Sequence, residues 1–230
     1  MNYAIILSGG IGTRMNNLGC PKQYYNVNGK MILEYTLEVF EKTTAIDRII
    51  LVMAEEWRAE LHASSLSRSK KITAFANPGR NRQESILHGL KECVNLSDSN
   101  NDMVIIHDAV RPCVSIGLIN RCIESLSMYD GCMPVLPMKD TVYQSKDGTV
   151  ISGLLNRSEI YAGQAPEAYL LHKYYEANIA LSEEKLLEIN GSTEAAFKYG
   201  LNICMIPGEE SNFKITTQED LRRFTEIVGG

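Results

Sequence analysis

The sequence predicts an α/β fold, built as a single Rossmann-like, mostly parallel sheet with helices on both faces. Short apolar, β-rich segments alternate with segments of helical periodicity along the 230 residues, which favours parallel strands joined by helical crossovers. No stretch has the composition of a linker, so we expect one domain over residues 1–230. The expected strands are 3–7, 48–53, 72–75, 103–107, 131–137 and 202–206. The expected helices are 31–43, 55–66, 82–95, 116–127, 167–180 and 217–227.

Two of the expected helices carry start signals in the sequence. Asn81 precedes Arg82-Gln83-Glu84, and Thr216-Thr217-Gln218-Glu219 is a capping-box pattern. The second signal places Lys214 at the mouth of a helix N-terminus, where negative charge is favoured.

Two segments interrupt the alternation of strands and helices. In residues 141–151, Asp147-Gly148 separates two β-prone runs, which predicts a hairpin that projects from the sheet. We expect this arm, residues 138–157, to join two copies of the chain in a homodimer. Residues 181–200 are mixed, with a helical pattern over 183–188 and a second helix opened by Gly191-Ser192-Thr193-Glu194.

Composition excludes several classes of protein. With 44% hydrophobic and 22% charged residues the chain is typical of a globular protein, and its net charge of −5 argues against a broad nucleic-acid surface. No apolar run approaches the roughly 18 residues that span a membrane. The six cysteines form no CxxC pair, and the N-terminus enters a strand directly. We therefore expect a cytoplasmic protein with free thiols, no nucleic-acid partner and no membrane contact.

A glycine-rich loop follows the first expected strand, in the order Ser8-Gly9-Gly10-Ile11-Gly12-Thr13-Arg14, and Lys22 comes shortly after it. Glycines let backbone N–H groups approach an anion, and the two cations suit a polyphosphate that reacts. The P-loop pattern is absent, and the dinucleotide turn lacks its third glycine. A nucleotidyltransferase loop remains, with a glycine turn flanked by solvated cations as the alternative.

Asp108 follows a buried strand, at the sheet edge where open α/β folds hold their ligands. A carboxylate there suits Mg²⁺ beside phosphates, and the alternative is a structural residue that pairs with Arg111. His107 belongs to the strand and is interpreted as structural. Two weaker signals complete the set. Residues 77–85 are interpreted as recognising a base through Gly79 and Ser85. Lys214 supplies a third cation, with a solvated surface charge as the alternative.

Taken in this order, these segments resemble the cytidylyltransferases that activate alditol phosphates, the group of 2-C-methyl-D-erythritol 4-phosphate cytidylyltransferase and its ribitol-5-phosphate relatives. The resemblance spans nearly the whole chain. It is carried by residues 8–15 with 21–24, 79–90, 107–112, 137–141, Arg157 and 212–216.

The resemblance implies a role for each matching residue. The implied catalytic residues, which surround the phosphates, are Arg14, Lys22 and Lys214. The implied nucleotide-binding residues are Leu7, Ser8, Gly9, Gly10, Ile11, Gly12, Gly79, Ser85, Asp108 and Ala109, with Asp108 beside Mg²⁺ or another divalent cation. The implied acceptor-binding residues are Arg111, Thr141 and Arg157, the last two reaching from the arm into the site of the partner subunit.

The chain departs from the methylerythritol pattern near the implied acceptor site. Gln164-Ala165-Pro166-Glu167 stands where that family commonly has Gln-Thr-Pro-Gln, and residues 190–195 replace a Thr-Asp-Asp/Glu-Ala stretch. The run 191–194 is more similar to the ribitol-phosphate branch, and Arg80 stands where an acidic residue is frequent. The acceptor is therefore open between methylerythritol phosphate and ribitol phosphate, and with it the pathway, isoprenoid precursor or cell-surface polymer.

The expected reaction is in-line attack of an acceptor phosphate oxygen on the α-phosphorus of CTP, giving a CDP-alditol and pyrophosphate. Such a reaction needs alignment and charge neutralisation rather than a protein nucleophile. The nearest alternative is a sugar-1-phosphate nucleotidylyltransferase, which uses a similar first loop. An NAD-dependent oxidoreductase is a more distant alternative, because the third glycine and a Tyr-x-x-x-Lys pattern are missing.

Overall fold

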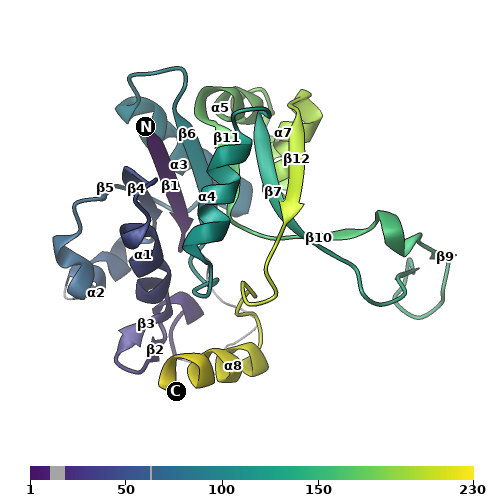
Figure 1. Cartoon of the computed structure of the whole chain (residues 1–230), viewed down its shortest axis with the longest axis horizontal. Helices are drawn as coiled ribbons and strands as arrows, with labels where there is room; N and C mark the ends of the chain where they lie inside the picture. The colour runs from purple at the N-terminus through teal and green to yellow at the C-terminus, as the bar shows by residue number, and fades with distance from the viewer. Residues whose placement is uncertain (11–18, 63) are drawn as a thin grey trace.

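A central mixed sheet organises the chain in the computed structural model, which describes residues 1–10, 19–62 and 64–230 (Figure 1). Along the sheet the strands run in the order β10-β7-β11-β6-β1-β4-β5, and β12 also pairs with β7. The strands are β1 (Asn2–Leu7), β4 (Arg48–Val52), β5 (Ile72–Ala76), β6 (Met103–Asp108), β7 (Gly131–Pro137), β10 (Tyr161–Gly163), β11 (Glu167–Leu170) and β12 (Ile203–Pro207). The predicted α/β class is confirmed.

Most strand pairs in this sheet are parallel. Strands β6, β1, β4 and β5 pair in parallel, as do β7 and β12, whereas β11 is antiparallel to both β6 and β7. Leu7, the last residue of β1, is in register with Val52 and with Asp108. The carboxyl ends of β4, β1 and β6 therefore lie side by side, which is where open α/β sheets bind ligands.

Helices cover both faces of the sheet. The long helices are α1 (Ile32–Lys42), α3 (Arg82–Leu96), α4 (Ile116–Ser125), α5 (Leu171–Ile179), α7 (Ser192–Tyr199) and α8 (Gln218–Gly229). Ile6 of β1 faces the cluster that contains buried side chains of α1 and α4, and Ile5 faces the one formed with α3, α5 and α7. Because successive strand residues point to opposite faces, one apolar strand anchors both layers. Among the described residues, no helix is long and apolar enough to cross a membrane.

A third apolar cluster lies beyond the carboxyl edge of the sheet. Phe224 of α8 packs there with Ile32, Val110 and Ile215, next to the small strands β2 (Asn26–Val27) and β3 (Lys30–Met31). Helix α8 begins one residue later than its sequence signal suggested, with Thr217 as N-cap and Asp220, not Glu219, completing the capping box. Asn81 caps α3 as predicted, its side chain accepting from the Glu84 N–H.

Two predicted helices differ from the structure. The helix expected over 167–180 begins only at Leu171, because residues 167–170 form β11 between β6 and β7. Pairing on both sides outweighs local helical preference there. The helix expected over 55–66 is broken into a 3₁₀ turn (Glu55–Trp57), α2 (Arg58–His62) and a second 3₁₀ turn (Ser65–Arg68), which the Ser64 hydroxyl caps.

The predicted arm projects from one side of the molecule (Figure 1). Its strands, β8 (Tyr143–Gln144) and β9 (Gly153–Leu154), pair over only two residues each. The expected second strand at 149–151 instead forms part of the turn, because the Asp147 carboxylate accepts from the N–H groups of Thr149 and Val150, both at 2.9 Å. Helices α6 (Glu183–Glu188) and α7 occupy the mixed segment, as the sequence suggested.

Candidate active site

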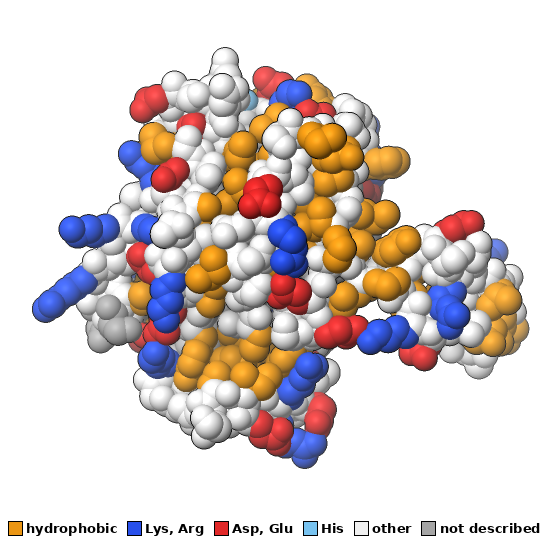
Figure 2. Space-filling model, viewed as in Figure 1, with side chains coloured by type: hydrophobic (Ala, Val, Ile, Leu, Met, Phe, Trp, Pro, Cys, Tyr) orange, Lys and Arg blue, Asp and Glu red, His pale blue; other side chains and the backbone are white. Residues whose placement is uncertain are grey.

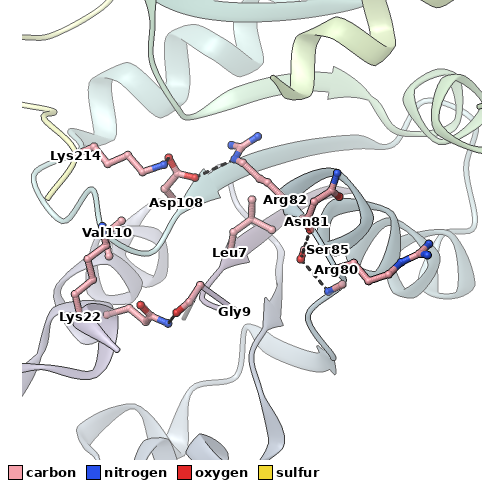
Figure 3. Close-up of a pocket in the computed structure, with 13 residues that line it drawn as sticks. Leu7, Gly9, Lys22, Arg80, Asn81, Arg82, Ser85, Asp108, Val110 and Lys214 are labelled. Atoms are coloured by element: carbon pink, nitrogen blue, oxygen red, sulfur yellow. Dashed lines mark hydrogen bonds and ion pairs between the residues drawn. The ribbon is translucent and has the colours of Figure 1, made fainter. Parts of the chain in front are cut away.

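A cavity of about 400 Å³ opens at the carboxyl ends of β1 and β6 (Figure 3). The strand order reverses there, since β4 and β5 lie on one side of β1 and the next strand of the sheet, β6, lies on the other. The cavity is lined by Leu7, Gly9, Gly10, Lys22, Gln23, Gly79, Arg80, Asn81, Arg82, Ser85, Asp108, Val110 and Lys214. The topology thus gathers cations and exposed backbone from segments that are far apart in the sequence.

The floor of the cavity is the backbone that follows β1. Gln23 Nε2 donates to the carbonyls of Ser8 and Gly10 at 2.8 and 2.7 Å, and the Tyr24 hydroxyl donates to the Ser8 carbonyl at 2.6 Å. A Cβ on Gly9 would lie 2.5 Å from Pro78, so only glycine fits at this close approach. The predicted Ile11, Gly12 and Arg14 lie outside the described residues.

One end of the cavity is built from the loop between β5 and α3. The Gly79 N–H donates to Ser85 Oγ at 2.9 Å, and the same hydroxyl donates to the Asn81 carbonyl at 2.8 Å. A Cβ on Gly79 would lie 2.6 Å from the Glu84 side chain. Arg80 pairs with Glu84 at 2.7 Å on the rim. Gly79 and Ser85 are therefore fixed against each other, as a small polar recognition surface requires.

Asp108 is surrounded by three positively charged side chains at the other end of the cavity. Lys214 Nζ lies 3.0 Å from Asp108 Oδ2, Arg111 Nε lies 3.4 Å from the same oxygen, and Arg82 Nε lies 3.2 Å from Oδ1. Burial alone would raise the pKa of Asp108, but the charges of Arg82, Lys214 and Arg111 hold that pKa far below its usual range. Asp108 is thus a carboxylate at any physiological pH.

His107, next to Asp108, is buried and structural in its surroundings. Its Nε2 lies 3.1 Å from the Arg111 carbonyl, and its ring lies against Phe40. Burial lowers the pKa of His107 to about 4, so its imidazole is neutral near pH 7. The side chain supports the loop that carries Arg111.

Comparison with known proteins decides the family. The model of the 2-C-methyl-D-erythritol 4-phosphate cytidylyltransferase family, IspD, matches residues 2–229. The chain belongs to this family. Solved IspD-type structures agree. The 4-diphosphocytidyl-2C-methyl-D-erythritol synthase of Anaerococcus prevotii DSM 20548 is 27% identical with a TM-score of 0.81, covering 100% of this chain and 96% of its own. The Francisella tularensis 2-C-methyl-D-erythritol 4-phosphate cytidylyltransferase is 29% identical with a TM-score of 0.81, covering 98% of each chain.

Membership of the IspD family makes the chain an enzyme, a nucleotidyltransferase of the cytidylyltransferase class. The resemblance inferred from the ordered loops is confirmed. The two alternatives, a sugar-1-phosphate nucleotidylyltransferase and an NAD-dependent oxidoreductase, are set aside by the match over nearly the whole chain.

The remaining predicted residues of this IspD-family chain fall into two groups. Leu7 lines the cavity, and its carbonyl accepts from the N–H of the buried Ala109 at 3.0 Å. Thr141 and Arg157 are exposed on the arm, and neither is among the described residues that line the cavity of their own chain. Arg157 Nη1 donates to the Lys139 carbonyl at 2.6 Å.

Arg82 is a cavity residue that the sequence analysis did not assign a role. Besides Asp108, its guanidinium contacts Ser192 Oγ at 2.5 Å and lies 3.6 Å from Glu167 Oε1. Arg82 lies in the segment 79–90 that carries part of the family resemblance, directly after Asn81, the N-cap of α3. Its partners come from β11 and α7, which no local pattern connects to it.

Proposed function

We propose that this IspD-family chain transfers CMP from CTP to an alditol phosphate, releasing pyrophosphate and a CDP-alditol. The family match supports 2-C-methyl-D-erythritol 4-phosphate as the first acceptor to test. The observation that carries the proposal is the convergence of Lys22, Lys214 and Arg82 around one cavity of about 400 Å³ beside the Ser8–Gly10 backbone. Positive charge of this kind stabilises a triphosphate, and glycine backbone allows the phosphates a close approach.

Each end of the cavity suits one part of the substrates. Gly79, Ser85 and the backbone from Leu7 to Gly10 form the side assigned to the cytidine. Lys22 and Lys214 line the part assigned to the phosphates, where Arg14 is proposed to join them. The acceptor phosphate is already an anion, so its oxygen attacks the α-phosphorus without a protein base. The chain aligns the reactants and neutralises the charge that develops on pyrophosphate.

The residues present fit a divalent cation held together with the nucleotide. Among the described residues, no cluster of three or more His, Cys, Asp or Glu side chains could hold a metal by itself. Mg²⁺ commonly takes one or two carboxylates and completes its shell with substrate phosphates and water. Asp108, ionised and at the cavity wall, is the proposed carboxylate. Bound there, Mg²⁺ would supply positive charge to the triphosphate.

One feature favours ribitol 5-phosphate as a second candidate acceptor. Ala165 occupies the position where methylerythritol enzymes commonly have threonine, and it is buried with its carbonyl held by Asn212 Nδ2 at 2.6 Å. Glu167 and Ser192 replace other residues of the methylerythritol pattern and bond to each other. The residues behind Arg82 and Asn212 therefore differ from that pattern at three positions, and we propose that these differences favour an alditol of another length or branching.

The arm supports the proposal of a homodimer. Val150 and Leu154 are 65% and 66% exposed on it, and Tyr143 is 58% exposed. Figure 2 shows apolar side chains at the tip of the arm and on the neighbouring face of the body. Apolar side chains presented on so thin a hairpin are typical of a surface that another chain covers. In such a dimer, Thr141 and Arg157 would reach the acceptor phosphate in the partner's site.

All six cysteines are free thiols, which supports a cytoplasmic location.

The test is a pyrophosphate-release assay with CTP, Mg²⁺ and one acceptor at a time. Methylerythritol 4-phosphate, ribitol 5-phosphate and an aldose 1-phosphate are compared at equal concentration. Turnover with either alditol phosphate supports the proposal, and the ratio between them identifies the acceptor. Turnover with the aldose 1-phosphate alone contradicts it.

A further inference from the structure

Arg82 lies between two carboxylates that belong to different parts of the fold. Its Nε is 3.2 Å from Asp108 Oδ1 at the end of β6, and its Nη2 is 3.6 Å from Glu167 Oε1 at the start of β11. Ser192 Oγ accepts from Nη1 at 2.5 Å, on the same side as Glu167. The guanidinium is therefore held from two directions, by Asp108 on one side and by Glu167 with Ser192 on the other.

Glu167 is oriented toward Arg82 and is no part of the cavity lining. Its Oε2 accepts from the Tyr169 hydroxyl at 3.0 Å and from the Ser192 hydroxyl. The partners that the structure gives this buried side chain are hydroxyl donors and the Arg82 guanidinium. Glu167 thus contributes a fixed negative charge beside Arg82.

Asp108 has both oxygens engaged in this structure. Arg82 takes Oδ1, while Lys214 and Arg111 share Oδ2. A divalent cation that uses Asp108 has to compete with these charges. Lys214 has the triphosphate as an alternative partner once the nucleotide is bound, and Arg82 has Glu167.

We propose that Glu167 is the counter-charge that draws Arg82 away from Asp108 when the metal-bound nucleotide enters, and so sets how strongly CTP binding depends on a divalent cation. Glu167 acts through Arg82, which makes it a positioning residue. The inference rests on the proposed use of a metal at Asp108. Its basis is specific to this chain, because glutamine commonly occupies this position in the methylerythritol pattern.

The direction of the effect follows from charge. Replacing Glu167 by Gln keeps the size of the side chain and an oxygen that can accept hydrogen bonds, but removes one negative charge. Arg82 then remains on Asp108, and the cavity becomes more positive. Metal-free CTP, a polyanion, binds more tightly, while the additional affinity contributed by the metal decreases.

The experiment measures the dissociation constant of CTP by calorimetry, once with EDTA and once with Mn²⁺. The value with EDTA is divided by the value with Mn²⁺, so a larger ratio means more additional affinity from the metal. In Glu167→Gln we expect this ratio to fall by about tenfold, the size of one nearby partly screened charge. Tyr169→Phe is the matched control, because it removes a hydroxyl from the same carboxylate and leaves the charge. Its ratio should stay within about twofold of the unsubstituted chain.

A second variant moves the ratio the other way. Arg82→Gln removes the competing cation itself, so the additional affinity from Mn²⁺ should rise. If the unsubstituted chain gains affinity from Mn²⁺ while Glu167→Gln has the same ratio, or Arg82→Gln a lower one, the counter-charge proposal is wrong and the proposed function stands. If Mn²⁺ leaves CTP affinity of the unsubstituted chain unchanged, the proposed metal site fails and this inference fails with it.

Discussion

Lys214 Nζ lies 3.0 Å from Asp108 Oδ2, an ion pair that joins the segment before α8 to the end of β6. The Ile215 N–H donates to the Val110 carbonyl at 2.9 Å, and the Ile215 side chain is fully buried beneath it. The backbone therefore sets the position of Lys214 independently of its charge. Asp108 is the partner that keeps this ammonium group directed into the cavity.

Replacing Lys214 by Ala should reduce turnover by about 10²–10³-fold, the cost of removing one donor that stabilises developing charge. The fold should persist, because Ile215 and its hydrogen bond to Val110 remain. Pyrophosphate release at saturating CTP and acceptor measures the loss, and the melting temperature checks the fold. Lys214→Arg keeps the charge and should lose less activity. Near-normal turnover of Lys214→Ala would show that the ammonium group has no part in the transfer.

Lys22→Ala should lower turnover by a similar factor of about 10²–10³. Lys22 lines the cavity at the start of a short 3₁₀ turn, while the adjacent Gln23 and Tyr24 hold the Ser8 and Gly10 carbonyls. The substitution thus removes charge and leaves the loop contacts of its neighbours in place. Lys91→Ala, on an exposed position of α3, is the matched control. An equal effect of the two substitutions on pyrophosphate release would contradict the assigned role.

The sequence predicted those parts of the fold and site that local patterns encode. Each parallel strand was found, because a short apolar run such as residues 103–107 can only be buried between two helical layers. The Asn81 cap and the glycine-rich backbone at Gly9 are likewise local. These signals placed Asp108 at the carboxyl edge of the sheet and Lys214 before a capped helix, and the structure brings the two side chains together.

Features that depend on distant partners were missed. Residues 167–170 form a strand because they pair with β6 and β7, and the four residues alone do not predict either pairing. Arg82 contacts Asp108, Glu167 and Ser192, and these three residues lie close together only in the folded sheet. The sequence analysis therefore offered the local pair of Asp108 with Arg111, which the structure contains, but not the contacts of Asp108 with Arg82 and Lys214.

His107 gives the stability of the fold a pH dependence in the mildly acidic range. Burial lowers its pKa to about 4, whereas an unfolded histidine has a pKa of about 6.5. Below about pH 6.5 the unfolded state binds a proton that the folded state excludes, so the free energy of unfolding falls as the pH falls. The contribution of His107 should decrease by about 3 kcal/mol between pH 6.5 and 4.

Urea unfolding of the unsubstituted chain and of His107→Gln at several pH values isolates this contribution. Glutamine retains a donor for the Arg111 carbonyl but does not titrate, so its stability should change less across this interval. The difference between the two curves should therefore diminish as the pH is lowered. Parallel curves for the two proteins would mean that His107 is not held neutral in the folded state.

Leu154→Glu should convert the proposed dimer into monomers and lower activity. Leu154 is 66% exposed on the arm, and a carboxylate there would be buried without a partner if a second chain covers it. Multi-angle light scattering gives the mass, and pyrophosphate release gives the activity. Met128→Glu, at a body position that is 77% exposed, is the control and should change neither. Because Thr141 and Arg157 act across the dimer in this proposal, the loss should appear mainly in the KM of the acceptor. A Leu154→Glu monomer that keeps the acceptor KM would mean that each chain binds its acceptor without the partner's arm.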